Sequence, residues 1–90
     1  MIRFPLGRVV ATPGALSALE KAEQQPAEFL DRHVNGDWGE VPEADKQENE
    51  RSVEQGFRIL SADTTSAGDK LWILTEADRS ATILMLPEEY

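Results

Sequence analysis

The spacing of apolar residues changes past the middle of the chain. Before residue 57 apolar positions recur mostly at helical intervals, whereas from Phe57 onward they follow the two-residue period of strands. A short apolar run near the N-terminus adds one more strand candidate. The predicted strands are 6–11, Phe57–Ala62, Lys70–Thr75 and Ser80–Leu86. Short polar links join the last three, which predicts an antiparallel meander.

Two helices are predicted in the first third of the chain. Thr12 followed by Pro13 is typical of a helix start, because the hydroxyl accepts from a free N–H and proline has no N–H to satisfy. This helix should end near Gln24, and the next should cover 26–34. The apolar stripe of the second helix is Phe29, Leu30, His33 and Val34.

A third helix should begin at Pro42 and end at Gly56. Only Ala44 and Val53 are apolar between these residues, so the helix should lie on the surface and be anchored mostly at its ends. The fold class expected is therefore α+β, with a short N-terminal strand, three helices and then a three-stranded antiparallel meander.

The sequence of the middle strand predicts a sheet with two apolar faces, each of which must be covered. Leu71, Trp72, Ile73 and Leu74 are consecutive apolar residues, and the helices can cover only one face. The N-terminal segment or a second copy of the chain should cover the other. A homodimer is one solution.

Composition narrows the functional classes. The chain has 90 residues, so we expect a single domain, 1–90, and its net charge of −8 disfavours direct nucleic-acid binding. With no cysteine and one histidine, we expect no cofactor and no metal site within one copy. No stretch approaches the length of a membrane span and the N-terminus is too interrupted for a signal peptide, so we predict a cytoplasmic protein without membrane association.

Acidic residues gather between Asp37 and Glu54, where seven acids face only two basic residues. Carboxylates spaced along a helix can imitate a row of phosphates and so block a basic nucleic-acid groove, or they can simply solvate the surface. Trp38 lies in the same segment, as either a core plug or an exposed contact. The candidate partner-binding residues are Asp37, Trp38, Glu40, Glu43, Asp45, Glu48, Glu50 and Glu54.

Three polar residues are candidates for catalysis. His33 with Asp37 could form an oriented base, and Glu76 with Arg79 lies in the link before the last strand. A site of His33, Glu76 and Arg79 requires the end of the second helix to meet that link. The structural alternatives are a hydrogen-bonded core histidine and ordinary turn residues.

Five stretches distributed over nearly the whole chain form a further pattern. They are Phe4-Pro5-Leu6-Gly7, Val10-Ala11-Thr12-Pro13-Gly14-Ala15-Leu16, Arg32-His33-Val34-x-Gly36-Asp37-Trp38-Gly39, Trp72-Ile73-x-Thr75-Glu76-Ala77-Asp78-Arg79-Ser80 and Leu86-Pro87-Glu88-Glu89-Tyr90. Together they resemble a family of small uncharacterised bacterial proteins found on plasmids, phages and integrated elements, some labelled plasmid-related or restriction-associated. The resemblance implies a mobile-element setting rather than a chemistry. Relatives commonly carry Tyr where this chain has Asp63.

The leading functional hypothesis is a mobile-element protein that binds a basic host protein, such as a defence nuclease, as a nucleic-acid-mimicking inhibitor. One alternative is a dimeric structural or regulatory module without catalysis. The other is a small hydrolase or nuclease-like toxin that uses His33, Glu76 and Arg79.

Overall fold

The computed structural model describes residues 1–90 and confirms the α+β class. Its elements are β1 (Arg8–Ala11), α1 (Pro13–Ala22), α2 (Pro26–Val34), α3 (Glu43–Gln55), β2 (Ile59–Thr64), β3 (Lys70–Thr75), β4 (Ala81–Met85) and the 3-10 turn η1 (Pro87–Glu89). The Thr12 hydroxyl accepts from Ala15 N at 3.1 Å, which confirms the predicted start of α1.

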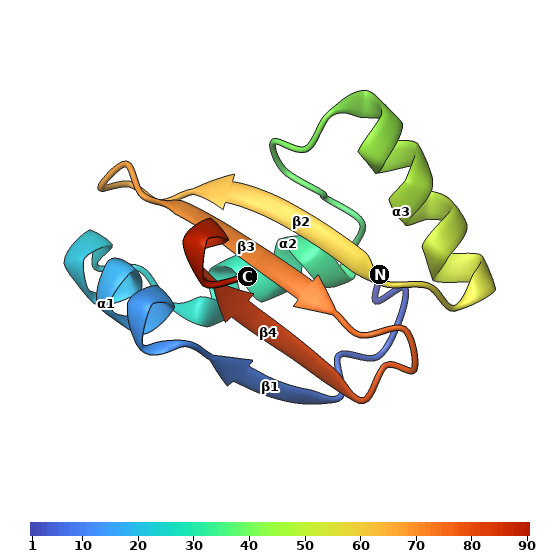
Figure 1. Cartoon of the computed structure of the whole chain (residues 1–90), viewed down its shortest axis with the longest axis horizontal. Coiled ribbons are helices and arrows are strands. Elements are labelled where there is room, and N and C mark those ends of the chain that lie inside the picture. Colours follow the sequence, from blue (N-terminus) through green and yellow to red (C-terminus); the bar gives the residue numbers. More distant parts are fainter.

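The sheet has four strands in the order β1-β4-β3-β2. The antiparallel pairs β2–β3 and β3–β4 form the predicted meander, but β1 joins it in parallel beside β4, from Arg8↔Ala81 to Ala11↔Leu84. The sheet is therefore mixed, which corrects the expected three-stranded meander. The helical segment carries the chain from β1 at one edge of the sheet to β2 at the other, and the meander then brings β4 back beside β1 (Figure 1).

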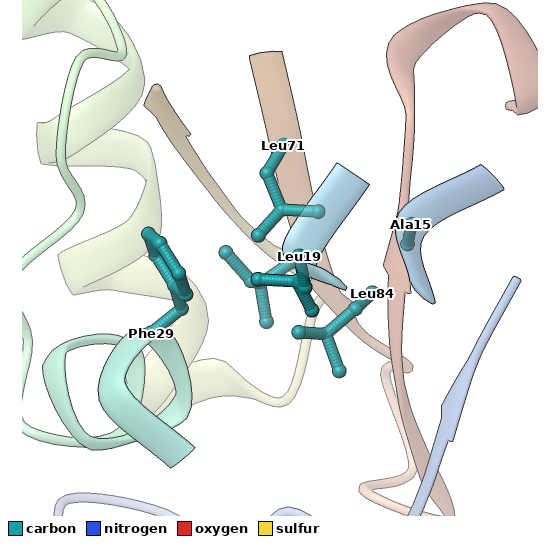
Figure 2. Close-up of a cluster of buried hydrophobic side chains, with 6 residues drawn as sticks. Ala15, Leu19, Phe29, Leu71 and Leu84 are labelled. Carbon is teal, nitrogen blue, oxygen red and sulfur yellow. The ribbon is translucent and has the colours of Figure 1, made fainter. Parts of the chain in front are cut away.

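Helices α1 and α2 cover one face of the sheet and enclose the main core (Figures 1 and 2). α1 supplies Ala15 and Leu19, α2 supplies Phe29, and all three are almost completely buried. They meet the inward-facing residues Leu71, Ile73 and Leu84 of β3 and β4. Burial of these apolar side chains is the main force holding both helices on the sheet.

The C-terminus covers part of the opposite face. η1 folds back over β3, and the Tyr90 ring lies 5.7 Å from that of Trp72 (Figure 1). This arrangement corrects the expectation that the N-terminal segment or a second copy supplies all of that cover. The N-terminal segment instead contributes Phe4 to a second cluster with Trp38, Val41 and Ile59.

α3 lies at the β2 edge of the sheet, away from α1 and α2 (Figure 1). It buries only the polar residues Asn49 and Ser52, so its predicted surface position is confirmed. The Asn49 amide donates to Leu60 O at 2.8 Å and accepts from Leu60 N at 3.2 Å, as a neighbouring strand would. The helix is thus anchored at its middle as well as its ends, which corrects the prediction.

The loop before α3 completes the cover of the β2 edge. Ala62 N donates to Trp38 O, and Glu40 N donates to Ala62 O. Gly39 has φ +71, and a Cβ there would collide with Ala62 O, so the close approach requires glycine. With Asn49, this loop leaves few free backbone groups at the β2 edge.

Candidate protein-binding face

The exposed carboxylates of α3 form two rows because successive residues turn by 100° around a helix. The outer row is Glu43, Glu50 and Glu54, and the cavity row is Asp45 and Glu48. All five are exposed; the outer row lies away from the anchors Asn49 and Ser52, whereas the cavity row lies beside Asn49. The predicted acidic surface therefore exists, but as two rows of different character.

Glu50 in the outer row is engaged within the fold. Its carboxylate accepts from the Arg3 guanidinium at 2.7 and 2.8 Å and from the Trp38 indole at 2.9 Å. The Arg3 and Trp38 hydrogen bonds lower the pKa of Glu50 below its usual value. Glu43 and Glu54 form no ion pair, so they are the row's free charges.

The cavity row borders a hollow of about 250 Å³ between α3 and β2. Val41 and Leu60 provide its apolar lining, Asp45 and Glu48 its carboxylates, and Asn49 and Arg58 complete it. Glu48 is paired with Arg51 at 2.9 Å in an exposed, weak ion pair, whereas Asp45 has no partner. The hollow suits a side chain with an apolar stem and a cationic end, such as lysine or arginine.

The acids before α3 have structural partners. Glu40 accepts from Lys70 at 2.9 Å and from Thr64 at 2.8 Å, and these bonds lower its pKa. Asp37 accepts from Gly39 N at 3.1 Å and stabilises the loop. Both carboxylates remain exposed, but each already accepts hydrogen bonds from groups within the fold.

Of the two alternatives for Trp38, a core plug or an exposed contact, the structure shows the core plug, because only 4% of its surface is exposed. Its ring stacks on Phe4 at 6.2 Å and lies edge-on to His33 at 5.9 Å. Its inclusion among the partner-contacting residues is therefore corrected, because a partner at the surface cannot reach the indole face.

His33 is completely buried within a chain of hydroxyl groups. The Thr82 hydroxyl donates its hydrogen to Leu6 O at 2.7 Å. In the 2.8 Å bond between Thr75 and Thr82 the donor is therefore the Thr75 hydroxyl. His33 Nε2 must then donate to Thr75 Oγ1, and Nδ1 accepts from Ser61. Burial lowers the pKa of His33 to about 4, so the ring is neutral at pH 7 and both its nitrogens are occupied.

Glu76 and Arg79 do not join His33 in an open site. Arg79 donates to the carbonyls of Ser52 and Phe57 at 2.7 Å each and holds the C-terminus of α3, while Glu76 pairs with Arg58 at 3.5 Å. The Phe4 ring packs edge-on against His33 at 5.3 Å, and the Arg79 guanidinium lies 5.7 Å from the centre of that same ring. The three-part site of His33, Glu76 and Arg79 is therefore not formed, and neither is a His33–Asp37 pair.

Asp63 is an unusual group that the sequence patterns did not single out as a site. It is 4% exposed, its Oδ1 lies 3.4 Å from Arg32, and its Oδ2 has no hydrogen-bond partner. Burial raises its pKa, although Arg32 opposes this shift. Strand alternation places Asp63 on the same face as Ile59 and Ser61, but the predicted strand ended at Ala62 and so did not include it.

No family model, curated protein or solved structure matches the chain. None of its helices has the length and apolar character required to span a bilayer. No three histidine, aspartate or glutamate side chains are grouped in a way that could hold a metal ion.

Proposed function

We propose that this protein is an interaction protein that binds a partner with a basic surface through the two acidic rows of α3. The observation that carries the proposal is the hollow beside α3, where exposed Asp45 and Glu48 stand next to the apolar side chains of Val41 and Leu60. The core takes Asn49, Ser52 and part of Val53 from this helix, so its carboxylates other than Glu50 are available for recognition.

The cavity row anchors the partner. A lysine or arginine side chain places its methylene stem against Val41 and Leu60 and its charged end between Asp45 and Glu48. The outer row then adds longer-range attraction, which accelerates the encounter and weakens as salt is added.

The outer row also supports nucleic-acid mimicry in an anti-defence role. Glu43, Glu50 and Glu54 follow one another at ~10 and ~6 Å along the helix at ~1.5 Å per residue, so three carboxylates cover the length of about five phosphate steps of one DNA strand at ~3.4 Å each. A basic groove that binds duplex DNA would therefore meet a row of charge of similar length but lower density, in which Glu50 is already paired with Arg3. The mobile-element setting implied by the family resemblance is consistent with such a target.

Affinity capture from the bacterial host with the full chain tests this function. The expected partner has a basic surface, is released by salt, and is displaced by excess short duplex DNA. Capture that duplex DNA does not affect would contradict the mimicry, and capture that is insensitive to salt would contradict the acidic contact altogether.

Variants of the two rows define the contact. The cavity-row variant is Asp45→Lys/Glu48→Lys, and the outer-row variant is Glu43→Lys/Glu54→Lys. A matched control, Glu20→Lys/Asp31→Lys, changes the net charge equally at exposed acids that form no ion pair. The cavity-row variant should lose capture most, the outer-row variant should lose less, and the control should retain it.

A catalytic function is not proposed, because His33 is buried and Arg79 is used to hold backbone carbonyls. The alternative of a dimeric module is supported by a different feature, the uncovered β1 edge of the sheet.

A further inference from the structure

The two edges of the sheet differ in how they are covered. The β2 edge is closed by Asn49 of α3 and by the loop at Trp38–Glu40. The β1 edge has no neighbour beyond it, and α1 turns back to pack on β4 rather than outward (Figure 1). An uncovered strand edge presents a row of backbone groups that can pair with another strand.

The hydrogen bonds of β1 identify which of its groups are free. Arg8 N donates to Ser80 O, and Thr12 N donates to Leu84 O. Backbone groups alternate between the two edges of a strand, so the N–H and C=O groups of Val9 and Ala11 point away from β4. The side chains of Val9 and Val10 are 43% and 37% exposed. The edge therefore offers both backbone pairing and apolar contact.

Neither of two common defences against edge pairing is present here. β1 has the sequence Arg-Val-Val-Ala, with no proline and a single charge. Its residues continue the parallel register with β4 from Arg8 to Ala11 without a bulge. Proline and bulges, two devices that commonly keep edge strands unpaired, are therefore absent from β1.

The distribution of charge points to a second copy of this chain as the partner that pairs with the β1 edge. Two copies with a net charge of −8 repel each other, yet residues 1–19 contain Arg3 and Arg8 and no acidic residue. Pairing through β1 joins the molecules at an edge where Glu89, held by Thr12 of one copy, comes opposite Arg8 of the other. It places the two α3 helices at opposite ends of the combined sheet, where their carboxylates are far apart (Figure 1).

We infer that β1 pairs antiparallel with β1 of a second copy about a two-fold axis at Val10, forming a continuous eight-stranded sheet. In this register Val9 of one copy pairs with Ala11 of the other, and each such pair exchanges two backbone hydrogen bonds. The two Val10 side chains meet at the axis, and Arg8 lies opposite Thr12 rather than another arginine. The contact is small, so association should occur at micromolar concentrations and leave α3 of each copy available.

Charge pairs at the axis test this register. The wild-type chain should show a concentration-dependent dimer in sedimentation velocity. Val10→Lys and Val10→Glu should each be monomeric, because like charges face each other across the axis, and an equimolar mixture should recover the dimer. Val10 is exposed enough for both variants to fold, which far-UV circular dichroism checks.

Amide hydrogen exchange provides a readout inside the same strand. The amides of Val9 and Ala11 should become more protected as wild-type concentration rises, whereas the amide of Val10, which faces β4, should be protected throughout. A wild-type chain that stays monomeric up to about a millimolar would overturn the inference. So would a dimer that persists in Val10→Lys, because that dimer would use another surface, such as the face around Trp72.

Discussion

α2 and α3 both lie outside the same sheet, yet they are held by different kinds of contact. α2 inserts Phe29, His33 and Val34 into the core, and none of them is available to solvent. α3 buries only Asn49 and Ser52 and is fixed by bonds to backbone groups. The difference shows how a helix can be well placed while its charged side chains remain free for a partner.

The comparison also separates two uses of polar residues. The hydroxyl chain around His33 satisfies a polar ring inside the core, so that ring stabilises the fold and cannot act on a substrate. The carboxylates of α3 have few such obligations, apart from Glu50. We therefore propose that the partner binds on the helix that contributes least to the core.

The largest difference between the helices should appear when each loses its principal apolar side chain. Phe29→Ala should reduce the free energy of unfolding by about 3–5 kcal/mol, because it leaves a cavity in the main core. Val53→Ala on α3 should cost only about 1 kcal/mol, since that side chain is half-buried. Urea unfolding monitored by tryptophan fluorescence measures both, and equal losses would contradict the proposed division.

Lowering the pH should reduce the free energy of unfolding through His33 of α2. Its pKa falls from 6.5 to about 4 on folding, so the unfolded chain binds a proton that the native chain excludes. This contribution, about 3 kcal/mol, is fully present above pH 6.5 and is lost as pH falls toward 4. Unfolding free energies of wild type and His33→Gln across this range should show a steeper fall for wild type; parallel curves would refute the assignment.

Removing the polar anchor of α3 should have an intermediate effect. Asn49→Ala leaves Leu60 N and O without their partner and should cost about 1–3 kcal/mol. Hydrogen exchange should accelerate at the Leu60 amide while the amides of β3 remain protected. Gln47→Ala, at an exposed position of the same helix, is the control and should change little.

The smallest stability effect is expected at Asp63, and it should be a gain. Its buried Oδ2 has no partner and burial raises its pKa, so the ionised form is unfavourable in the fold. Asp63→Asn should add about 1 kcal/mol at neutral pH. The gain should shrink as pH falls through the raised pKa, because wild-type Asp63 then takes up a proton. A variant that is less stable at pH 7 would show that the contact with Arg32 outweighs burial.

Local signals predicted the elements whose ends are marked by their own residues. Pro26 defines the start of α2, and β3 matches its predicted range of Lys70–Thr75. The parallel pairing of β1 with β4 could not be predicted in this way, because no turn links the two strands. β2 begins two residues later than predicted because Phe57 points into solvent instead of the core.

The candidate site was predictable to a similar extent. The absence of an apolar stripe correctly placed α3 and its acids at the surface. Sequence could not show that Glu50 binds the distant Arg3, that Trp38 packs against Phe4, or that Asp45 and Glu48 border a hollow. Each of these depends on residues brought together only by the fold.

The most direct test of the account compares partner affinity among variants of equal net charge. The captured partner is purified and titrated calorimetrically with wild type, Asp45→Lys/Glu48→Lys and Glu20→Lys/Asp31→Lys. The account predicts that the cavity-row variant loses about tenfold or more in affinity, while its unfolding free energy changes by less than about 1 kcal/mol and the control binds like wild type. Equal losses in both variants would show that only net charge matters, and full affinity in the cavity-row variant would contradict a binding role for α3.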